Sequence, residues 1–140
     1  MASYLVTGVA RGLGLEIVKA LAQKPTSEVS TVFATLRSSP PPTLQELVSQ
    51  SEGRVVLVNL EVLDPDSLAG AVRQVKERLD GRGLDILINN AAVNELSPGG
   101  LETMNNLRET LEVNVEAVHN VTLALLPLLR KGRRKTVLNM

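Results

Sequence analysis

The chain has 140 residues, of which 15 are Lys or Arg, 15 are Asp or Glu, and 44% are hydrophobic. This length suits one domain, and 24 Leu, 18 Val and 3 Ile provide an aliphatic core that argues against disorder. With no cysteine and one histidine, the composition excludes disulfides, a zinc cluster and a Ser/His/Asp triad, so we expect no metal. Zero net charge and only two aromatic residues argue against a nucleic-acid or membrane-surface partner.

From these residues we expect no signal peptide and no membrane segment. Residues 1–6 lack a basic stretch, and Gly8 follows before an apolar signal sequence could form. The most apolar later stretch, 118–129, is too short to cross a bilayer and contains His119 and Pro127. We therefore expect a soluble cytoplasmic protein.

Short β-branched runs alternate with segments of helical period, which predicts βαβ units and a parallel sheet. The expected elements, in chain order, are a strand 3–7, a helix from Leu13 that ends before Pro25, a strand 31–36, a short helix capped by Thr43, a strand 55–59, a helix that starts at 64–66, a strand 84–88, a loop 92–100, a helix 107–130 and a strand 136–140. Right-handed crossovers place helices on both faces of such a sheet. The prediction is one doubly wound, Rossmann-type α/β domain over residues 1–140 with about five strands.

The first strand runs into a glycine-rich turn, residues 7–14, with the sequence TGVARGLG. Gly8 permits a sharp exit from the strand, Gly12 lets the backbone approach a pyrophosphate, and Gly14 allows close packing of the following helix. The N–H groups at that helix start would then face the anion. An ordinary glycine-rich turn is the alternative, but the strand–turn–helix context favours a dinucleotide site, and the absence of Gly-Lys-Ser/Thr excludes a P-loop.

The end of the second strand indicates which dinucleotide is bound. NAD-binding folds place a carboxylate there to accept hydrogen bonds from the ribose, whereas this chain has Leu36. The next residue, Arg37, offers a guanidinium that suits a phosphate, and Arg11 in the glycine turn can approach the same end. These residues predict NADP as the cofactor.

The helix expected at 107–130 has an apolar stripe, and a basic run follows it. The stripe consists of Leu107, Leu111, Val115, Val118, Val121, Leu125 and Leu129. Five of the six residues 130–135 are basic. Cations are favoured at a helix C-terminus, so we interpret this run as a solvated turn, with nucleic-acid binding or nuclear localisation as the alternative.

Four ordered motifs resemble the classical short-chain dehydrogenase/reductase family. The first is the TGxxxGxG turn at 7–14, and the second is DILINNAA at 85–92, which resembles the family's NNAG motif with Ala92 in place of glycine. The third is Asn114 in the long helix, and the fourth is 136–140, which resembles the strand that leads to the catalytic serine. Within the family, the chain looks most similar to the carbonyl-reductase and C-factor-like branch.

The resemblance implies an NADP-dependent oxidoreductase that transfers hydride between the cofactor and a small carbonyl compound or secondary alcohol. It assigns Asn114 to the catalytic set and Glu61 with Val62 to the adenine. The complete set of expected cofactor-binding residues is Thr7, Gly8, Ala10, Arg11, Gly12, Leu13, Gly14, Arg37, Glu61, Val62, Asn89, Asn90 and Ala91.

The other catalytic residues of the family, a Ser and a Tyr-x-x-x-Lys, have no match in these 140 residues, because the one tyrosine, Tyr4, has no lysine four positions later. The chain therefore resembles only the N-terminal, cofactor-binding part of such an enzyme, C-terminally incomplete and inactive alone. The alternative is a non-catalytic dinucleotide-binding module or sensor. In either case, we expect strand 136–140 to be an exposed edge and helix 107–130 to offer a surface for homo-oligomers.

Overall fold

The computed structural model describes residues 1–94 and 97–140, so residues 95 and 96 of the expected loop lie outside the described part. Five parallel strands form one sheet in the order β3-β2-β1-β4-β5. The strands are β1 (Ala2–Val6), β2 (Val29–Leu36), β3 (Val55–Asn59), β4 (Ile86–Asn89) and β5 (Thr136–Asn139). The predicted parallel, Rossmann-type fold is confirmed, and the expected strand ends lie within two residues of the observed ones, with β3 matching at both ends.

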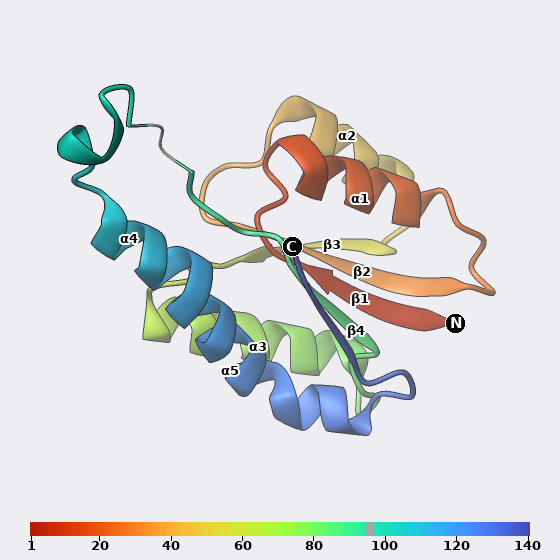
Figure 1. Ribbon diagram of the computed structural model, residues 1–140. Helices are drawn as coiled ribbons and strands as arrows, with labels where there is room; N and C mark the ends of the chain where they lie inside the picture. The colour runs from red at the N-terminus through yellow and green to blue at the C-terminus, as the bar shows by residue number, and fades with distance from the viewer. Residues whose placement is uncertain (95–96) are drawn as a thin grey trace.

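Helices cover both faces of the sheet (Figure 1). One face carries α1 (Gly12–Ala22) and α2 (Pro42–Gln50), and the other carries α3 (Pro65–Leu79) and α5 (Ala117–Lys131). Each face has its own apolar cluster, and successive residues of β1 enter opposite clusters, Leu5 on the α3 side and Val6 on the α1 side. This alternation is the consequence of the strand's two-residue period, and it explains the near-continuous apolar strands.

The starts of two helices test the predicted caps. At α3, Asp64 Oδ1 accepts a hydrogen bond from Asp66 N at 2.9 Å, which confirms the predicted start. At α2, the prediction that Thr43 caps the helix is wrong, because the helix begins at Pro42 and Pro41 occupies the cap position. A proline in the first turn already has a helical φ and has no N–H that requires an acceptor.

The expected long helix runs from Leu107 to Lys131, but in three segments. These are α4 (Leu107–Leu111), a π-helical turn η2 (Glu112–Glu116) and α5. Because a π turn inserts extra backbone, it rotates the preceding residues relative to the core. Val113 and Ala117 are consequently buried, whereas Leu107, Leu111 and Val115 are 53%, 52% and 61% exposed. The exposed first part of the apolar stripe agrees with the expectation that this helix offers a surface. Its later residues Val121, Leu125 and Leu129 are buried.

Two parts of the described chain are poorly covered. Strand β5 forms one end of the sheet, and Val137 and Leu138 are 36% and 47% exposed, which confirms the expected open edge. The short 3-10 helix η1 (Gly100–Thr103) projects away from the body of the molecule (Figure 1). None of the helices in residues 1–94 and 97–140 has the length and apolar character needed to span a bilayer.

A buried carboxylate connects the amino ends of three strands. Asp85 Oδ2 accepts hydrogen bonds from Ser3 N at 2.9 Å and Ser3 Oγ at 3.2 Å, and its Oδ1 accepts from Arg133 N at 2.7 Å and Arg134 N at 3.4 Å. Burial by itself raises the pKa of Asp85, but these hydrogen bonds, of which the strongest contribution comes from Ser3 N, outweigh burial and lower the pKa. The ionised carboxylate thus holds β1, β4 and the turn before β5 together.

We expect Asp85→Asn to lower the free energy of unfolding by about 1–3 kcal/mol at neutral pH, because the amide NH2 would face an N–H donor. Since the folded-state pKa is lowered, the contribution of the carboxylate is present above the ordinary Asp pKa of about 3.9 and is lost as the pH falls through the folded-state value. Urea unfolding at about pH 7 and about pH 3 measures both effects.

The matched control is Asp80→Asn, since Asp80 is exposed at the left-handed C-cap of α3, where Asn is equally suited. An unchanged unfolding free energy in Asp85→Asn would contradict the role of this carboxylate.

Candidate functional site

The glycine turn lies at the carboxyl edge of the sheet, between β2 and β4. Thr7 N donates to Ile88 O at 3.0 Å, and Val9 N donates to Thr35 O at 3.1 Å. Val9 is fully buried in the α1-side cluster. Val9 was not among the predicted site residues, although an apolar side chain inside a glycine-rich turn indicates an anchor. The turn is therefore fixed to both neighbouring strands.

The three glycines of the turn meet different surroundings. Gly8 has φ +70°, and a Cβ there would lie 2.7 Å from Ala91 Cα. Gly12 has φ +59°, and a Cβ there would meet nothing within 4 Å. A Cβ on Gly14 would lie 2.5 Å from both Asn90 Nδ2 and Gly8 O. Gly8 and Gly14 are thus required by packing within the protein, whereas the space at Gly12 is open to an incoming group.

The residues that directly follow β1 and β4 are joined by side-chain hydrogen bonds. Thr7 Oγ1 accepts hydrogen bonds from Asn90 N and Ala91 N, both at 2.9 Å. In return, Asn90 Nδ2 donates to Thr7 O at 2.9 Å and to Gly8 O at 3.1 Å. The structure therefore brings together four of the expected site residues from segments more than 80 positions apart.

The start of α1 leaves its N–H groups available. Arg11 occupies the N-cap with no side-chain hydrogen bond to the helix, and the first turn contains no acidic residue. Unpaired N–H groups and the positive end of the helix dipole favour an anion at this position. Arg11 and Leu13 are exposed beside it, and Ala10 is half-buried. This turn has the chemistry required to hold a pyrophosphate.

Two charged residues meet beyond the turn. Arg37 follows buried Leu36 at the end of β2, and its Nη1 lies 3.8 Å from Glu61 Oε2. Glu61 N donates to Ser67 Oγ at 2.9 Å, which fixes the backbone of the segment after β3, and Val62 packs against the α3-side cluster. The Arg37 side chain is 74% exposed, so the ion pair leaves most of the guanidinium accessible. Both residues were expected at the adenosine end of the cofactor, but their pairing was not predicted.

The side-chain amide of Asn89 makes hydrogen bonds to other residues of the protein. The residue is buried, and its Nδ2 donates to Thr122 Oγ1 at 3.1 Å and to Asn139 Oδ1 at 2.9 Å. This amide connects β4 to α5 and β5. Thr122 carried no signal in the sequence, because nothing local indicates that its hydroxyl faces β4.

Asn114, the expected catalytic residue, lies in the π-helical turn η2. Its Oδ1 accepts from Val93 N and its Nδ2 donates to Val93 O, both at 2.9 Å. The carboxamide thus satisfies both backbone groups of the residue that follows the NNAA segment, and it attaches η2 to the end of β4. A narrow hollow is lined by residues that include Thr7, Val62, Ala91, Val113 and Val118.

Comparison with known proteins relates this geometry to enzymes. The family model for short chain dehydrogenases matches residues 3–140. The short-chain dehydrogenase/reductase AacuF of Aspergillus aculeatus is 37% identical across the whole of this chain and 54% of its own length. Estradiol 17-beta-dehydrogenase 2 of Mus musculus is 33% identical, over 96% of this chain and 35% of its own length. The chain thus spans about half of the first relative and about a third of the second.

Solved structures with the same fold include two carbonyl reductases. An NADPH-bound carbonyl reductase from chicken fatty liver superposes with a TM-score of 0.82 at 38% identity, over 94% of this chain and 49% of that protein. The carbonyl reductase Sniffer of D. melanogaster has a TM-score of 0.87 at 27% identity, over 100% of this chain and 61% of its own.

The contrast between Gly8 and Gly12 yields a test of the site. Both residues have positive φ, so alanine costs roughly 1–2 kcal/mol at either position. We expect Gly8→Ala to cost about 1–3 kcal/mol more than Gly12→Ala, because its Cβ would overlap the backbone of Ala91. Urea unfolding of the two variants measures the difference, and equal losses would contradict the packing described.

Proposed function

The chain belongs to the short-chain dehydrogenase family, and from this premise we propose that it binds NADP(H) and serves an oxidoreductase that acts on a carbonyl compound or secondary alcohol. The observation that carries the choice of cofactor is Arg37, directly after the end of β2. Folds that prefer NAD place a carboxylate at this end to bind the ribose hydroxyls, and Leu36 cannot do so. A guanidinium at this position instead favours the additional phosphate of NADP.

The Arg37–Glu61 ion pair does not oppose this choice. An exposed pair of this kind contributes roughly 0–1 kcal/mol, whereas hydrogen bonds to a phosphate contribute roughly 1.5–3 kcal/mol. A phosphate would therefore displace Glu61 from Arg37, which leaves the carboxylate free for a neutral donor such as the adenine amino group. The NADPH-bound carbonyl reductase, 38% identical to this chain, supports the same cofactor.

The residues of this chain would bind and orient the cofactor. The pyrophosphate would lie on the N–H groups between Gly8 and Leu13, with Thr7, Asn90 and Ala91 holding the turn in shape. NADPH, when bound, supplies a hydride to a carbonyl carbon, and the developing alkoxide then requires a proton. Asn114 positions the backbone at Val93 by its two hydrogen bonds and would border the reacting groups.

Residues 1–140 do not contain a match to the tyrosine that donates the proton in this family. The one tyrosine, Tyr4, lies in the middle of β1 and has no lysine four positions later. We therefore propose that residues 1–140 bind the cofactor but do not reduce a carbonyl on their own. A non-catalytic dinucleotide module or sensor is the second candidate, because of the family's catalytic residues only Asn114 is present.

By analogy with the family, we also propose a substrate class, an oligomeric state and a cellular location. The substrate is a small molecule, as the names of the carbonyl reductases and of the estradiol dehydrogenase indicate for those proteins. Exposed Leu107, Leu111 and Val115 support a homo-oligomer through the long helix. The proposed location is the cytoplasm.

We expect calorimetric titration to show tighter binding of NADPH than of NADH. Arg37→Ala should weaken NADPH binding by about tenfold or more through the loss of a charge-assisted phosphate contact, and should leave NADH binding unchanged. Glu61→Gln should strengthen NADPH binding, since Arg37 loses its competing partner. The control is Arg73→Ala, which removes an exposed arginine from α3. Equal affinities of the unmodified chain for the two cofactors would refute the assignment of NADP.

A second measurement separates the enzyme from the sensor. With NADPH and a panel of aldehydes and ketones, we expect residues 1–140 to show only background oxidation of NADPH, because no positioned acid is present. Turnover that is abolished by Gly12→Asp would contradict this expectation and would indicate an acid that we have not identified. If a longer form of the protein also fails to turn over any member of the panel while it binds NADPH, the sensor function is supported.

A further inference from the structure

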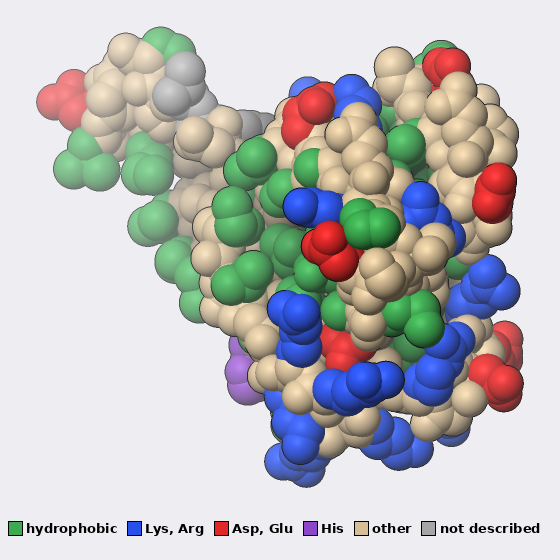
Figure 2. All heavy atoms as spheres, turned by 90° about the vertical axis from the view of Figure 1, so that its right-hand side faces the viewer, with side chains coloured by type: hydrophobic (Ala, Val, Ile, Leu, Met, Phe, Trp, Pro, Cys, Tyr) green, Lys and Arg blue, Asp and Glu red, His purple; other side chains and the backbone are tan. Residues whose placement is uncertain are grey.

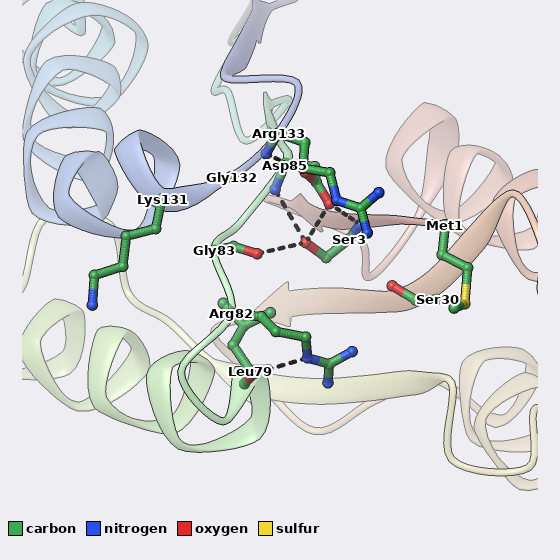
Figure 3. Close-up of a pocket in the computed structure, with 10 residues that line it drawn as sticks. All are labelled: Met1, Ser3, Ser30, Leu79, Arg82, Gly83, Asp85, Lys131, Gly132 and Arg133. Atoms are coloured by element: carbon green, nitrogen blue, oxygen red, sulfur yellow. Dashed lines mark hydrogen bonds between the residues drawn. The ribbon is translucent and has the colours of Figure 1, made fainter.

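A cavity of about 250 Å³ lies at the amino edge of the sheet, opposite the glycine turn (Figure 3). Its walls include Ser3 at the start of β1, the segment 82–85 before β4 and the turn 131–133 before β5. Ser3 and Gly8 are five residues apart along an extended segment, which is about 16 Å. The cavity is therefore separate from the proposed cofactor site.

Close backbone packing fixes the walls of the cavity. A Cβ on Gly83 would overlap the backbone of Gly132, and a Cβ on Gly132 would overlap Leu84 O, so only glycine fits at either position. Ser3 Oγ donates to Gly83 O at 3.1 Å, and Leu84 N donates to Leu128 O at 3.0 Å. The two segments that carry the cationic side chains of the cavity are thus held in one arrangement.

Three cations line the cavity, and none of them has an acidic side-chain partner. Arg82, Lys131 and Arg133 do not occur in any ion pair within residues 1–94 and 97–140. In Figure 3 the guanidinium groups of Arg82 and Arg133 extend toward the side where Met1 and Ser30 lie, whereas Lys131 extends away. Arg82 Nε donates to Leu79 O at 3.0 Å, which orients this side chain and leaves its terminal nitrogens available.

The opposing negative charge is smaller than the positive charge. Asp85 is the one acidic residue that lines the cavity, and its oxygens already accept hydrogen bonds from Ser3 and from the backbone of Arg133 and Arg134. The C-terminal ends of α3 and α5 add about half a negative charge each. The three lining cations therefore retain about one positive charge. The rest of the basic run, Arg130, Arg134 and Lys135, raises this excess, and Figure 2 shows Lys and Arg gathered over the lower half of this face.

We propose that this cavity is a second binding site, which takes a small phosphate-bearing anion between the guanidinium groups of Arg82 and Arg133. A planar guanidinium binds two oxygens of a phosphate at once, and an unpaired guanidinium has no competing carboxylate to release. The volume of about 250 Å³ lies just below the range of small-ligand pockets, roughly 300–1,000 Å³, so the site accommodates a phosphate with a small attached group. The basic run 130–135 thus contributes to an anion site.

The test is calorimetric titration of the purified full chain with pyrophosphate and with inorganic phosphate at low ionic strength. We expect saturable binding of one pyrophosphate at this site, and we expect Arg82→Gln and Arg133→Gln each to weaken it by about tenfold or more. Arg133→Gln retains the backbone N–H that binds Asp85, so the fold is preserved. Arg73→Gln, with the same loss of charge on an exposed face of α3, is the matched control and should leave binding unchanged.

Amide shifts in NMR spectra locate the anion independently of these variants. We expect shifts at Gly83, Asp85 and Gly132 that persist in Gly12→Asp. Binding that disappears in Gly12→Asp but survives in Arg82→Gln would place the anion at the glycine turn and overturn the proposal. Equal weakening by Arg73→Gln, or the absence of saturable binding, would also overturn it. Tighter binding of duplex DNA than of pyrophosphate through the same arginines would overturn the proposal as well, because the bound phosphate would then be part of a nucleic acid.

Discussion

Strand β4 is fastened to β1 at both of its ends by side-chain hydrogen bonds, and the remaining features of the molecule depend on this attachment. At the amino end, Asp85 binds Ser3 and the turn before β5. At the carboxyl end, Thr7 and Asn90 exchange hydrogen bonds with each other's backbone. The contacts between β1 and β4 bridge segments about 80 residues apart in sequence, so they form only when the crossover through β2, β3 and α3 is complete.

The two ends of the sheet carry different chemistry because the strands are parallel. All carboxyl ends meet at one edge, where the open N–H groups of α1 favour a phosphate and the turn at Gly12 leaves room for it. All amino ends meet at the other edge, where the C-termini of α3 and α5 attract the cations that follow them. At the amino edge, the positive charge of the cationic side chains exceeds the negative charge of the two helix ends and Asp85. The two edges of the sheet therefore each favour an anion, in separate places.

The π-helical turn η2 lies between an exposed apolar segment and the buried part of the long helix. Asn114 makes two hydrogen bonds with Val93, each of which contributes roughly 1 kcal/mol. On the N-terminal side of this turn, Leu107 and Leu111 are about half exposed. Burial of a leucine side chain contributes about 1.5–3 kcal/mol, so this arrangement leaves a large apolar stabilisation unused within the described chain. The exposed face is consequently the part of the fold that most favours association with further protein surface.

Local sequence determined the order of the elements, the parallel sheet, the glycine turn and the start of α3 at Asp64. Each of these follows from the residue period, from glycine at positive φ or from a cap that binds within its own first turn. Tertiary structure alone decided the interlock of Thr7 with Asn90, the binding of Asp85 to Ser3 and to the turn at Arg133, the pairing of Arg37 with Glu61 and the π turn at Asn114. These contacts join segments far apart in the chain, and their energies depend on distances between strands and helices that no local pattern contains.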